Sequence, residues 1–410
     1  MKWLHWATVL GRPVSNSLDM VRLILATLLI SSAANASAQL SGRFYLDKST
    51  FAAGEPVFLY FEVTNDGTEP VNIFQADPYS FCSGYQVKLH SGSESNTSCS
   101  PYGVAGSCLS SDTLLPAGKK YVQRLLLNFE HDLNSPGEYS VEVSRALPSA
   151  SAKLEYYEAP KDTLEVRDTL HFAVDSNATL ESKTLQPWVE QLQSRDASKR
   201  REAARTLAGI APPQLEDTLL TFADVAEFRQ FAPLAFHRLN TSRSIAALAS
   251  LVKQAQPGSN EHSESAQYLA ASGDQQWFPL LQEVAMENAQ NSIYPDYAAT
   301  LGGEKMLPTL ISLMNCSDRQ CARVSAVTAM GFTGSRAAVP ILIELLKNPD
   351  PDVADRTRYA LRLLTHRSVS KENADSPQSE YPAWSRWWAL EGPSAPIYKA
   401  SDCGEVTELH

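Results

Sequence analysis

Residues Ala337–Ser368 read AAVPILIELLKNPDPDVADRTRYALRLLTHRS and predict two short amphipathic helices separated by a break. The first half carries an apolar stripe of 3.6-residue period at Val339, Leu342, Ile343 and Leu346. The second half carries a similar stripe, at Val353, Thr357, Ala360, Leu361 and Leu364. Neither helix can bury its stripe alone, so the pair is expected to stack on further pairs.

Prolines and an aspartate mark the helix ends in this stretch. Pro340 is expected in the first turn of the first helix, where the missing N–H of proline leaves no helical hydrogen bond unmade. Asn348-Pro349 form the break. Asp350 is the predicted N-cap of the second helix, because its carboxylate can accept from the free N–H groups of the first turn.

The same plan recurs upstream, which makes an internal repeat the main organising feature. Residues 305–336 place Pro308 early in a first helix and Arg323 in a second helix. Arg356 stands at the matching position about one repeat later. Leu185–Ile210 is a third copy, with a proline, a capping aspartate and core leucines at corresponding places.

These copies resemble the short HEAT-like repeat, with the pattern V-P-x-L-x-x-x-L-x-x-x-D-x-x-V-R-x-x-A-x-x-A-L. The resemblance implies an α-solenoid over residues 184–368, a stack of helix pairs that serves as a binding surface. It also implies that Arg323 and Arg356 bond an aspartate or the backbone of an adjoining repeat, with partner contact as the alternative. The nearby aspartates are Asp318, Asp350 and Asp352.

The segments between the recognisable copies are also expected to be helical. Helices are predicted at Leu215–Leu239, Ser242–Lys253, Glu261–Ala271, Gln275–Glu287 and Tyr294–Leu301. With the three copies, they amount to about six helix pairs. Residues 177–183 are small and polar, which favours a linker before the first pair.

The first 38 residues are expected to be a targeting segment. Leu23–Ile30 is an apolar run too short to span a bilayer, and it follows the positive charge of Arg22. Ala36-Ser37-Ala38 fits a signal-peptidase site, which would leave Gln39 as the first mature residue. Two tryptophans and a proline precede the run, so Met20 is a second candidate for the true start. We therefore expect export to the periplasm or the extracellular space, without an integral membrane segment in the mature chain.

Residues 40–176 predict an all-β region. Short apolar or alternating runs recur about every ten residues, including Pro56–Thr64 and Glu138–Ser144, with Asn65-Asp66-Gly67 as a tight turn. A last pair of strands is expected at Ala152–Tyr157 and Thr169–Val174. The phrases FAAGEPVFLYFEVTNDGTEPVNI and SPGEYSVEVSRAL resemble immunoglobulin-like modules of exported bacterial proteins, and faintly the intracellular proteinase-inhibitor fold. The resemblance implies an immunoglobulin-like β-sandwich.

Residues 369–410 form a tail with one aromatic helix. Trp384, Trp387 and Trp388 share a face at i, i+3 and i+4. A helix stack needs its open end covered, so we expect these side chains to cap the last pair. An aromatic ligand platform is the alternative.

Six cysteines in an exported protein favour disulfides over metal sites. Cys316 and Cys321 lie close enough in sequence to bridge locally, and two of Cys82, Cys99 and Cys108 are expected to pair. The remaining one could bridge to Cys403. Which cysteines pair stays open.

No recognised catalytic, cofactor or metal motif occurs, and the formal net charge of −11 argues against a nucleic-acid partner. HEAT-like repeats also occur in phycobilin lyases, but those enzymes work in the cytosol and the export signal argues against that alternative. We therefore predict no enzyme, no cofactor and no metal. The expected chain is an α+β multidomain protein that acts as an exported, non-enzymatic scaffold for a protein partner.

Two other function classes remain open at this stage. One is a protease inhibitor that acts through the serine-rich insertion Ser91–Ser111. The other is a glycan-binding or surface-binding adhesin that uses aromatic side chains of the β-region, namely Tyr79, Phe81, Tyr85 and Tyr102.

Overall fold

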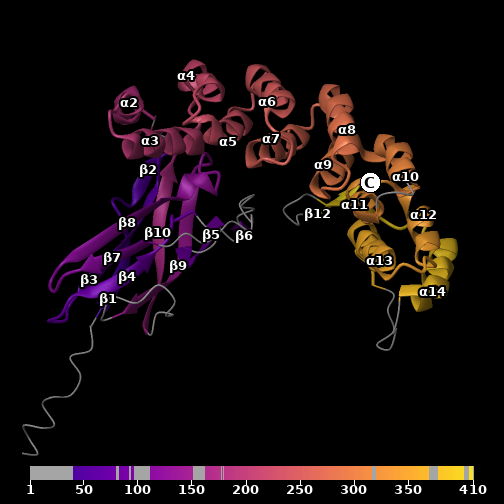
Figure 1. Ribbon diagram of the computed structural model, residues 1–410, viewed down its shortest axis with the longest axis horizontal. Helices are drawn as coiled ribbons and strands as arrows, with labels where there is room; N and C mark the ends of the chain where they lie inside the picture. The colour runs from indigo at the N-terminus through magenta and orange to yellow at the C-terminus, as the bar shows by residue number, and fades with distance from the viewer. Residues whose placement is uncertain are drawn as a thin grey trace, which may run out of the picture.

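A computed structural model describes residues 40–79, 83–91, 94–96, 111–150, 162–176, 178, 180–315, 320–368, 377–400 and 406–409. Strands occupy the chain up to residue 175, and helices follow from residue 182 to residue 390. We call these parts the β-region and the helical region. The helical region forms an arch, and the β-region lies beneath its first helices (Figure 1).

The β-region consists of two sheets. The smaller sheet has the antiparallel order β1-β3-β8, with β1 at Leu40–Leu46, β3 at Phe58–Asn65 and β8 at Lys120–Leu126. The larger sheet has the order β2-β10-β9-β4-β7, and β5 and β6 extend it beside β9. Its strands are β2 (Thr50–Ala52), β4 (Val71–Gln75), β5 (Tyr85–Ser91), β6 (Glu94–Asn96), β7 (Ser111–Leu115), β9 (Gly137–Ala150) and β10 (Asp162–Asp175).

The core of the β-region lies between the two sheets. Phe44 and Phe61 of the smaller sheet share one buried cluster with Val141, Leu147 and Phe172 of the larger sheet. Buried and less buried positions alternate along most of β9, as expected for a strand with one face on a core. Strands β9 and β10 are both longer than the sequence pattern indicates. Of the last expected pair, Ala152–Tyr157 lies outside the described residues.

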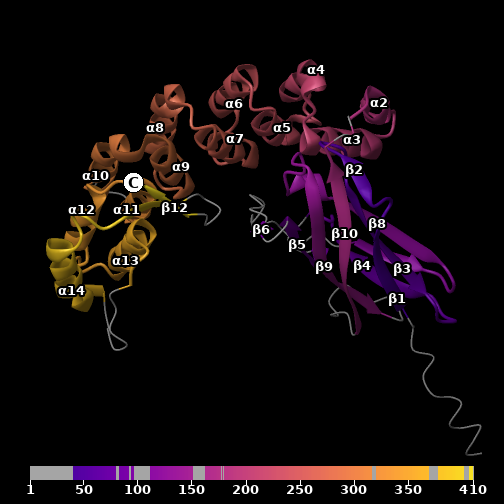
Figure 2. The same cartoon turned by 180° about the vertical axis from the view of Figure 1, so that it is seen from behind.

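The helices come in pairs, which form two layers of the arch (Figure 2). The first helices of the pairs are α2 (Ser182–Gln191), α4 (Glu216–Leu220), α6 (Ser242–Gln254), α8 (Phe278–Glu287), α10 (Leu307–Met314) and α12 (Ala338–Leu345). The second helices form the inner layer, and each contacts the next: α3 (Ala197–Ile210), α5 (Ala232–Leu239), α7 (Asn260–Ala271), α9 (Ile293–Gly302), α11 (Gln320–Phe332) and α13 (Pro351–Thr365). Within the described residues these are six pairs, the number that the sequence indicates.

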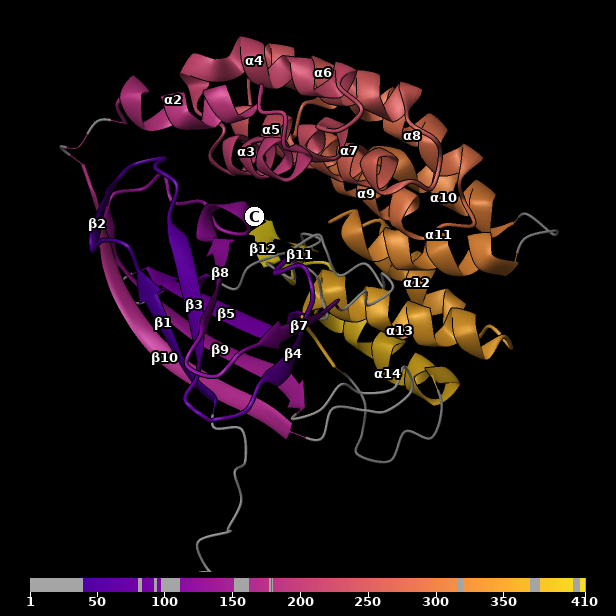
Figure 3. The same ribbon diagram turned by 60° about the vertical axis from the view of Figure 1, so that its left-hand side comes forward.

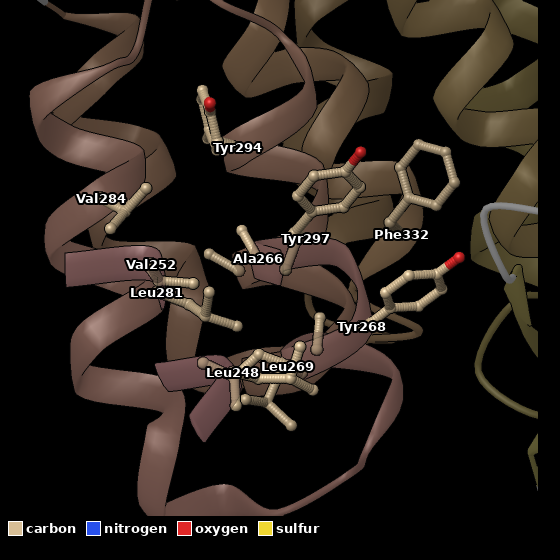
Figure 4. Packing of buried hydrophobic residues seen from close by; sticks show 14 of the residues in the cluster. Leu248, Val252, Ala266, Tyr268, Leu269, Leu281, Val284, Tyr294, Tyr297 and Phe332 are labelled. Atoms are coloured by element: carbon tan, nitrogen blue, oxygen red, sulfur yellow. The ribbon is translucent and has the colours of Figure 1, made fainter. Parts of the chain in front are cut away.

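One continuous apolar cluster joins the pairs. In the middle of the arch, the leucines and valines of α6, α7 and α8 interlock, and Tyr268, Tyr297 and Phe332 follow one another on α7, α9 and α11 (Figure 4). Prolines begin several of the helices, because a first-turn N–H needs no helical partner.

Two parts of the helical region differ from the sequence prediction. The stretch Leu215–Leu239, where the sequence predicts helix throughout, contains α4, α5 and short 3₁₀ turns between them. Pro233 lies in the first turn of α5, where its missing N–H leaves no helical hydrogen bond unmade, so it favours the start of a new helix there. Beyond α14 (Pro377–Leu390), a hairpin of β11 (Ile397–Ala400) and β12 (Val406–Leu409) ends the described chain, and the sequence prediction missed it.

Candidate functional site

The β-region is joined to the helical region by a shared core. Phe58, Leu126 and Phe129 belong by sequence to the β-region, but they are part of the apolar cluster of the helices. Gly209 of α3 makes this approach possible. A Cβ at Gly209 would lie 2.8 Å from Cδ2 of Leu126 and 3.4 Å from Cα of Phe129. We call this contact the junction; Figure 3 shows the β-region against the underside of α3.

A buried arginine connects both sides of the junction. Arg238 of α5 donates to the carbonyl oxygen of Gly209, and also to those of Phe129 and His131, each at 3.4 Å. Burial lowers the pKa of this guanidinium, and Asp132 counteracts the effect. Backbone carbonyls from both regions therefore satisfy one side chain, so the regions are held together by directional bonds as well as by apolar packing.

Two histidines beside Arg238 are held neutral. Burial, and then the charge of Arg238, lowers the pKa of His131 to about 4. The same causes, in the same order, lower the pKa of His237 to about 4. The ring of His237 stacks on Tyr268 of α7 at a centroid distance of 4.4 Å. The environment of the junction therefore keeps both histidines neutral at physiological pH.

Two more arginines line the outer part of the junction. Arg124 of β8 lies 2.5 Å from Glu202 of α3 and 5.5 Å from the ring centre of Trp188. Arg205 of α3, in the helical region, lies 3.2 Å from a carboxylate oxygen of Asp77 in the β-region. Each region thus contributes one arginine to an ion pair with the other region.

Two adjoining clefts open at this outer part. The first, of about 270 Å³, is lined by both regions, including Tyr79, Phe129 and Glu264. The second, of about 410 Å³, is lined by Phe58, Arg124 and Arg201 among others. Asp77, Tyr79, Arg205, Gln230 and Phe231 line both clefts. The sequence gives no sign of these clefts, because their walls come from elements that are far apart in the sequence.

The other end of the inner layer is covered by the C-terminal hairpin. Strand β11 packs on α13 and α11, and Ile397 is buried there. Arg336 donates to the carbonyl oxygens of Gly392 and Ala395, both at 2.7 Å, which fixes the approach to the hairpin. The inner faces of α7 and α9 therefore lie between two covered ends.

The repeat residues chosen from the sequence lie at helix ends and helix faces. Pro308 is in the first turn of α10, and Pro340 is the third residue of α12. Asp350 is the N-cap of α13, where its side chain accepts from the N–H of Asp352 at 3.0 Å. Arg323 donates to the carbonyl oxygen of Met314, within its own pair rather than to an adjoining one. Arg356 is exposed on α13.

The tryptophans lie on α14, which packs against α12 and α13. Trp384 and Trp387 are buried, and their rings meet edge to face at 5.5 Å, while Trp388 is partly buried. Glu380 of the same helix is also buried, and Arg358 of α13 lies 3.0 Å from its carboxylate. In this position the aromatic helix covers the last pair.

The cysteines and most of the serine-rich insertion singled out from the sequence lie outside the described part of the chain. Cys82, Cys99, Cys108, Cys316 and Cys403 lie outside the described residues, as does the side chain of Cys321, a residue of α11. Most of the Ser91–Ser111 insertion, with Tyr102, and also Phe81, lie outside them too.

Tyr79 and Tyr85 make internal contacts. The hydroxyl of Tyr79 accepts from the N–H of Leu126, and that of Tyr85 accepts from Arg145. Among the described residues, no three acidic, cysteine or histidine side chains gather as metal ligands. None of the described helices has both the length and the apolar composition of a membrane span.

Comparison with known families identifies one repeat. Residues 322–348 match the PBS lyase HEAT-like repeat, so the chain contains a HEAT-like repeat where the sequence pattern is most regular. No curated protein matches the chain in sequence.

Three solved structures show weak likeness. The phycocyanin lyase complex of CpcE and CpcF from Nostoc sp. PCC7120 has 14% identity and a TM-score of 0.32, covering 57% of this chain and 100% of that one. A Salmonella alpha-2-macroglobulin mutant has 11% identity and a TM-score of 0.18, covering 91% of this chain and 29% of that one. Trypsin-activated alpha-2-macroglobulin from Escherichia coli has 10% identity and a TM-score of 0.17, covering 90% and 30%.

The family match corrects one prediction. We predicted that the chain is not an enzyme, and this prediction is wrong, because the matching repeat family takes its name from a lyase. The prediction rested on missing catalytic motifs and on the expected export signal, which argued against a lyase. The absence of motifs is the weaker of these two grounds, because in a repeat protein functional side chains lie on a surface assembled from several repeats and form no contiguous motif.

Proposed function

We propose that the chain binds a protein partner on the inner faces of α7 and α9. The observation that carries this proposal is the position of these faces between two covered ends, the β-region at α3 and the hairpin at α11 and α13. HEAT-like repeats bury their own stripes against neighbours, so the inner layer is the surface that remains for a partner.

The exposed positions of the inner helices support this proposal. On α7, the less buried residues Asn260, Ser263 and Gln267 recur at helical spacing and form one stripe. On α9, Asp296 and Thr300 are partly exposed in the same way. Because helices pack about 8–10 Å apart, the axes of these two inner helices span roughly 10 Å, which is about three residues of an extended peptide.

The finer description of the chain is part of the same proposal. We propose that the β-region is an immunoglobulin-like sandwich, that the helices form an α-solenoid, and that the mature chain is exported. The turn-rich strand pattern and the apolar run Leu23–Ile30 support these statements. Intact mass and N-terminal sequencing of protein from the producing cell test export, with Gln39 as the expected first residue. Alkylation before and after reduction tests the disulfides.

The binding proposal is tested with two matched variants of the full chain. Partners captured by the wild-type chain are crosslinked, and the linked residues are mapped by mass spectrometry. Gln267→Arg adds a charge on the inner face of α7, whereas Gln254→Arg adds the same charge to the exposed end of α6 in the outer layer. We expect crosslinks on α7 and α9 and loss of capture only with Gln267→Arg. Crosslinks confined to the outer layer, or equal capture by both variants, would contradict the proposal.

A further inference from the structure

The second cleft at the junction has the size of a small-molecule site. Its volume of about 410 Å³ lies within the range of about 300–1,000 Å³ that such sites typically have. Its walls come from the β-region, from α3 and from the 3₁₀ turn Arg229–Phe231 that precedes α5. None of the described residues that line it belongs to α7 or α9, so this cleft is separate from the proposed partner-binding faces.

Three guanidinium groups and two carboxylates line this cleft. The charged residues of the lining are Arg124, Arg201, Arg205, Asp77 and Glu202. Each carboxylate already pairs with one arginine of the lining, Glu202 with Arg124 and Asp77 with Arg205. The third guanidinium, that of Arg201, is exposed and forms no ion pair within the part of the chain that the structure describes. The lining therefore carries one net positive charge, on Arg201.

The geometry of α3 places this charge beside a second guanidinium. Ser198, Arg201 and Arg205 follow one another at i, i+3 and i+7, so they lie on one face of the helix. Like charges four residues apart on a helix repel each other, and an anion between Arg201 and Arg205 would relieve this repulsion. Ser198 is exposed as well, and its hydroxyl can donate to an oxygen atom of such an anion.

The other two guanidinium groups are held in position by aromatic rings. Arg205 lies 4.2 Å from the ring centre of Tyr79, and Arg124 lies 4.7 Å from that of Phe58. Among the described residues, Arg205 donates only to Asp77 and does so through Nη2, so the N–H groups of Nη1 remain for another acceptor. Groups that are fixed before binding lose less conformational freedom when a ligand arrives, which favours binding.

We propose that this cleft binds a small molecule through an oxyanion, a phosphate or carboxylate group, held between Arg201 and Arg205. Guanidinium groups suit both kinds of oxyanion, because their planar N–H groups can form two parallel bonds to its oxygen atoms. The proposed partner-binding faces take no part in this site, so its test does not depend on the protein partner.

The proposal is tested by saturation-transfer difference NMR on the full chain with three probes, phenyl phosphate, benzoate and benzyl alcohol. The probes share a benzene ring and differ in the group that would meet the arginines. At pH 7.5 and constant ionic strength, we expect saturable binding of the anions and none of the alcohol. Tighter binding of phenyl phosphate would indicate a phosphate ligand and tighter binding of benzoate a carboxylate ligand, and either result supports an oxyanion site.

Two variants of α3 separate this site from general attraction of anions to the chain. Arg201→Gln should weaken the tighter-binding anion about tenfold, the factor expected for loss of one charge-assisted hydrogen bond. Lys199→Gln is the matched control, because Lys199 is exposed on the same helix and does not line the cleft. It removes the same charge and should leave binding nearly unchanged. Both side chains are exposed, and thermal unfolding verifies that both variants fold.

Any of three results would overturn the inference. The first is no saturable binding of either anion at about 10 mM, a concentration at which millimolar affinity is visible. The second is equal binding of the alcohol and the anions, and the third is equal weakening by Arg201→Gln and Lys199→Gln. These failures are distinct from failure of the proposed function, which is decided by crosslinks on α7 and α9.

Discussion

Acidification should destabilise the protein through the two histidines at the junction. The pKa values of His131 and His237 are about 4 in the folded chain, below the ordinary value of 6.5. Between pH 6.5 and pH 4 the unfolded chain binds protons at these sites and the folded chain does not. Protons therefore favour unfolding in this window, so the contribution to stability is complete above pH 6.5 and is lost as the pH falls toward 4.

The magnitude follows from the width of this window. Each histidine removes roughly 1.4 kcal/mol of unfolding free energy per pH unit within the window. At pH 5 the loss is about 2 kcal/mol for each ring, or roughly 4 kcal/mol for both relative to pH 7.5. Domains are typically stable by about 5–15 kcal/mol, so the effect should be large.

The assay is urea unfolding of the full chain at pH 7.5, 6 and 5. In His237→Phe, an aromatic ring can still stack on Tyr268, but the titrating group is gone, so the loss of stability between pH 7.5 and pH 5 should fall by about half. Tyr268→Phe is the matched control. It keeps the stack, and burial raises the pKa of Tyr268 well above this pH range, so its pH dependence should match the wild type.

Two results would refute this reasoning. One is parallel stability profiles for His237→Phe and the wild type, which would mean that His237 does not titrate with unfolding. The other is an increase in stability on acidification below pH 6.5, which would require the folded chain to bind more protons than the unfolded chain.

Three substitutions test the packing of the helical region by thermal and urea unfolding. Gly209→Val should cost about 1–3 kcal/mol, because a side chain there meets Leu126 at the junction, and unchanged stability would contradict the close approach. Asp350→Ala should cost about 1 kcal/mol by removing the cap of α13, whereas Asp350→Asn should cost less; equal effects would argue against capping. Trp384→Ala should cost about 3–5 kcal/mol, because its ring on α14 is 1% exposed, and a loss below 1 kcal/mol would contradict its role as a cover.

Local sequence patterns predicted the helix pairs well where each pair carries its own signals. Residues 337–368 combine a 3.6-residue apolar period, a proline at the start of one helix and Asp350 as the cap of the next. These signals act within one or two turns, so they can be recognised without knowing the neighbours. The match of residues 322–348 to a HEAT-like repeat falls in this regular part. Prediction was poorer at 215–239, where an apolar period continues but 3₁₀ turns separate α4 from α5.

The candidate site could not be predicted in the same way. Arg238 joins carbonyl oxygens that lie 29, 107 and 109 residues away in sequence. Nothing near Arg238 distinguishes it from a solvated arginine at the end of a helix. The same is true of Arg205, whose partner Asp77 is 128 residues away.

The sequence by itself determined that strands precede helices and that the helices pair, because hydrophobic period, caps and turns depend on neighbouring residues. Only the tertiary structure decided that the β-region shares a core with α3 and α5, and that a hairpin covers α11 and α13. Residues 337–368 owe their regularity to packing within and between the last pairs. The clefts and the buried histidines lie at the junction, where residues far apart in the sequence meet, and such contacts depend on how both regions pack.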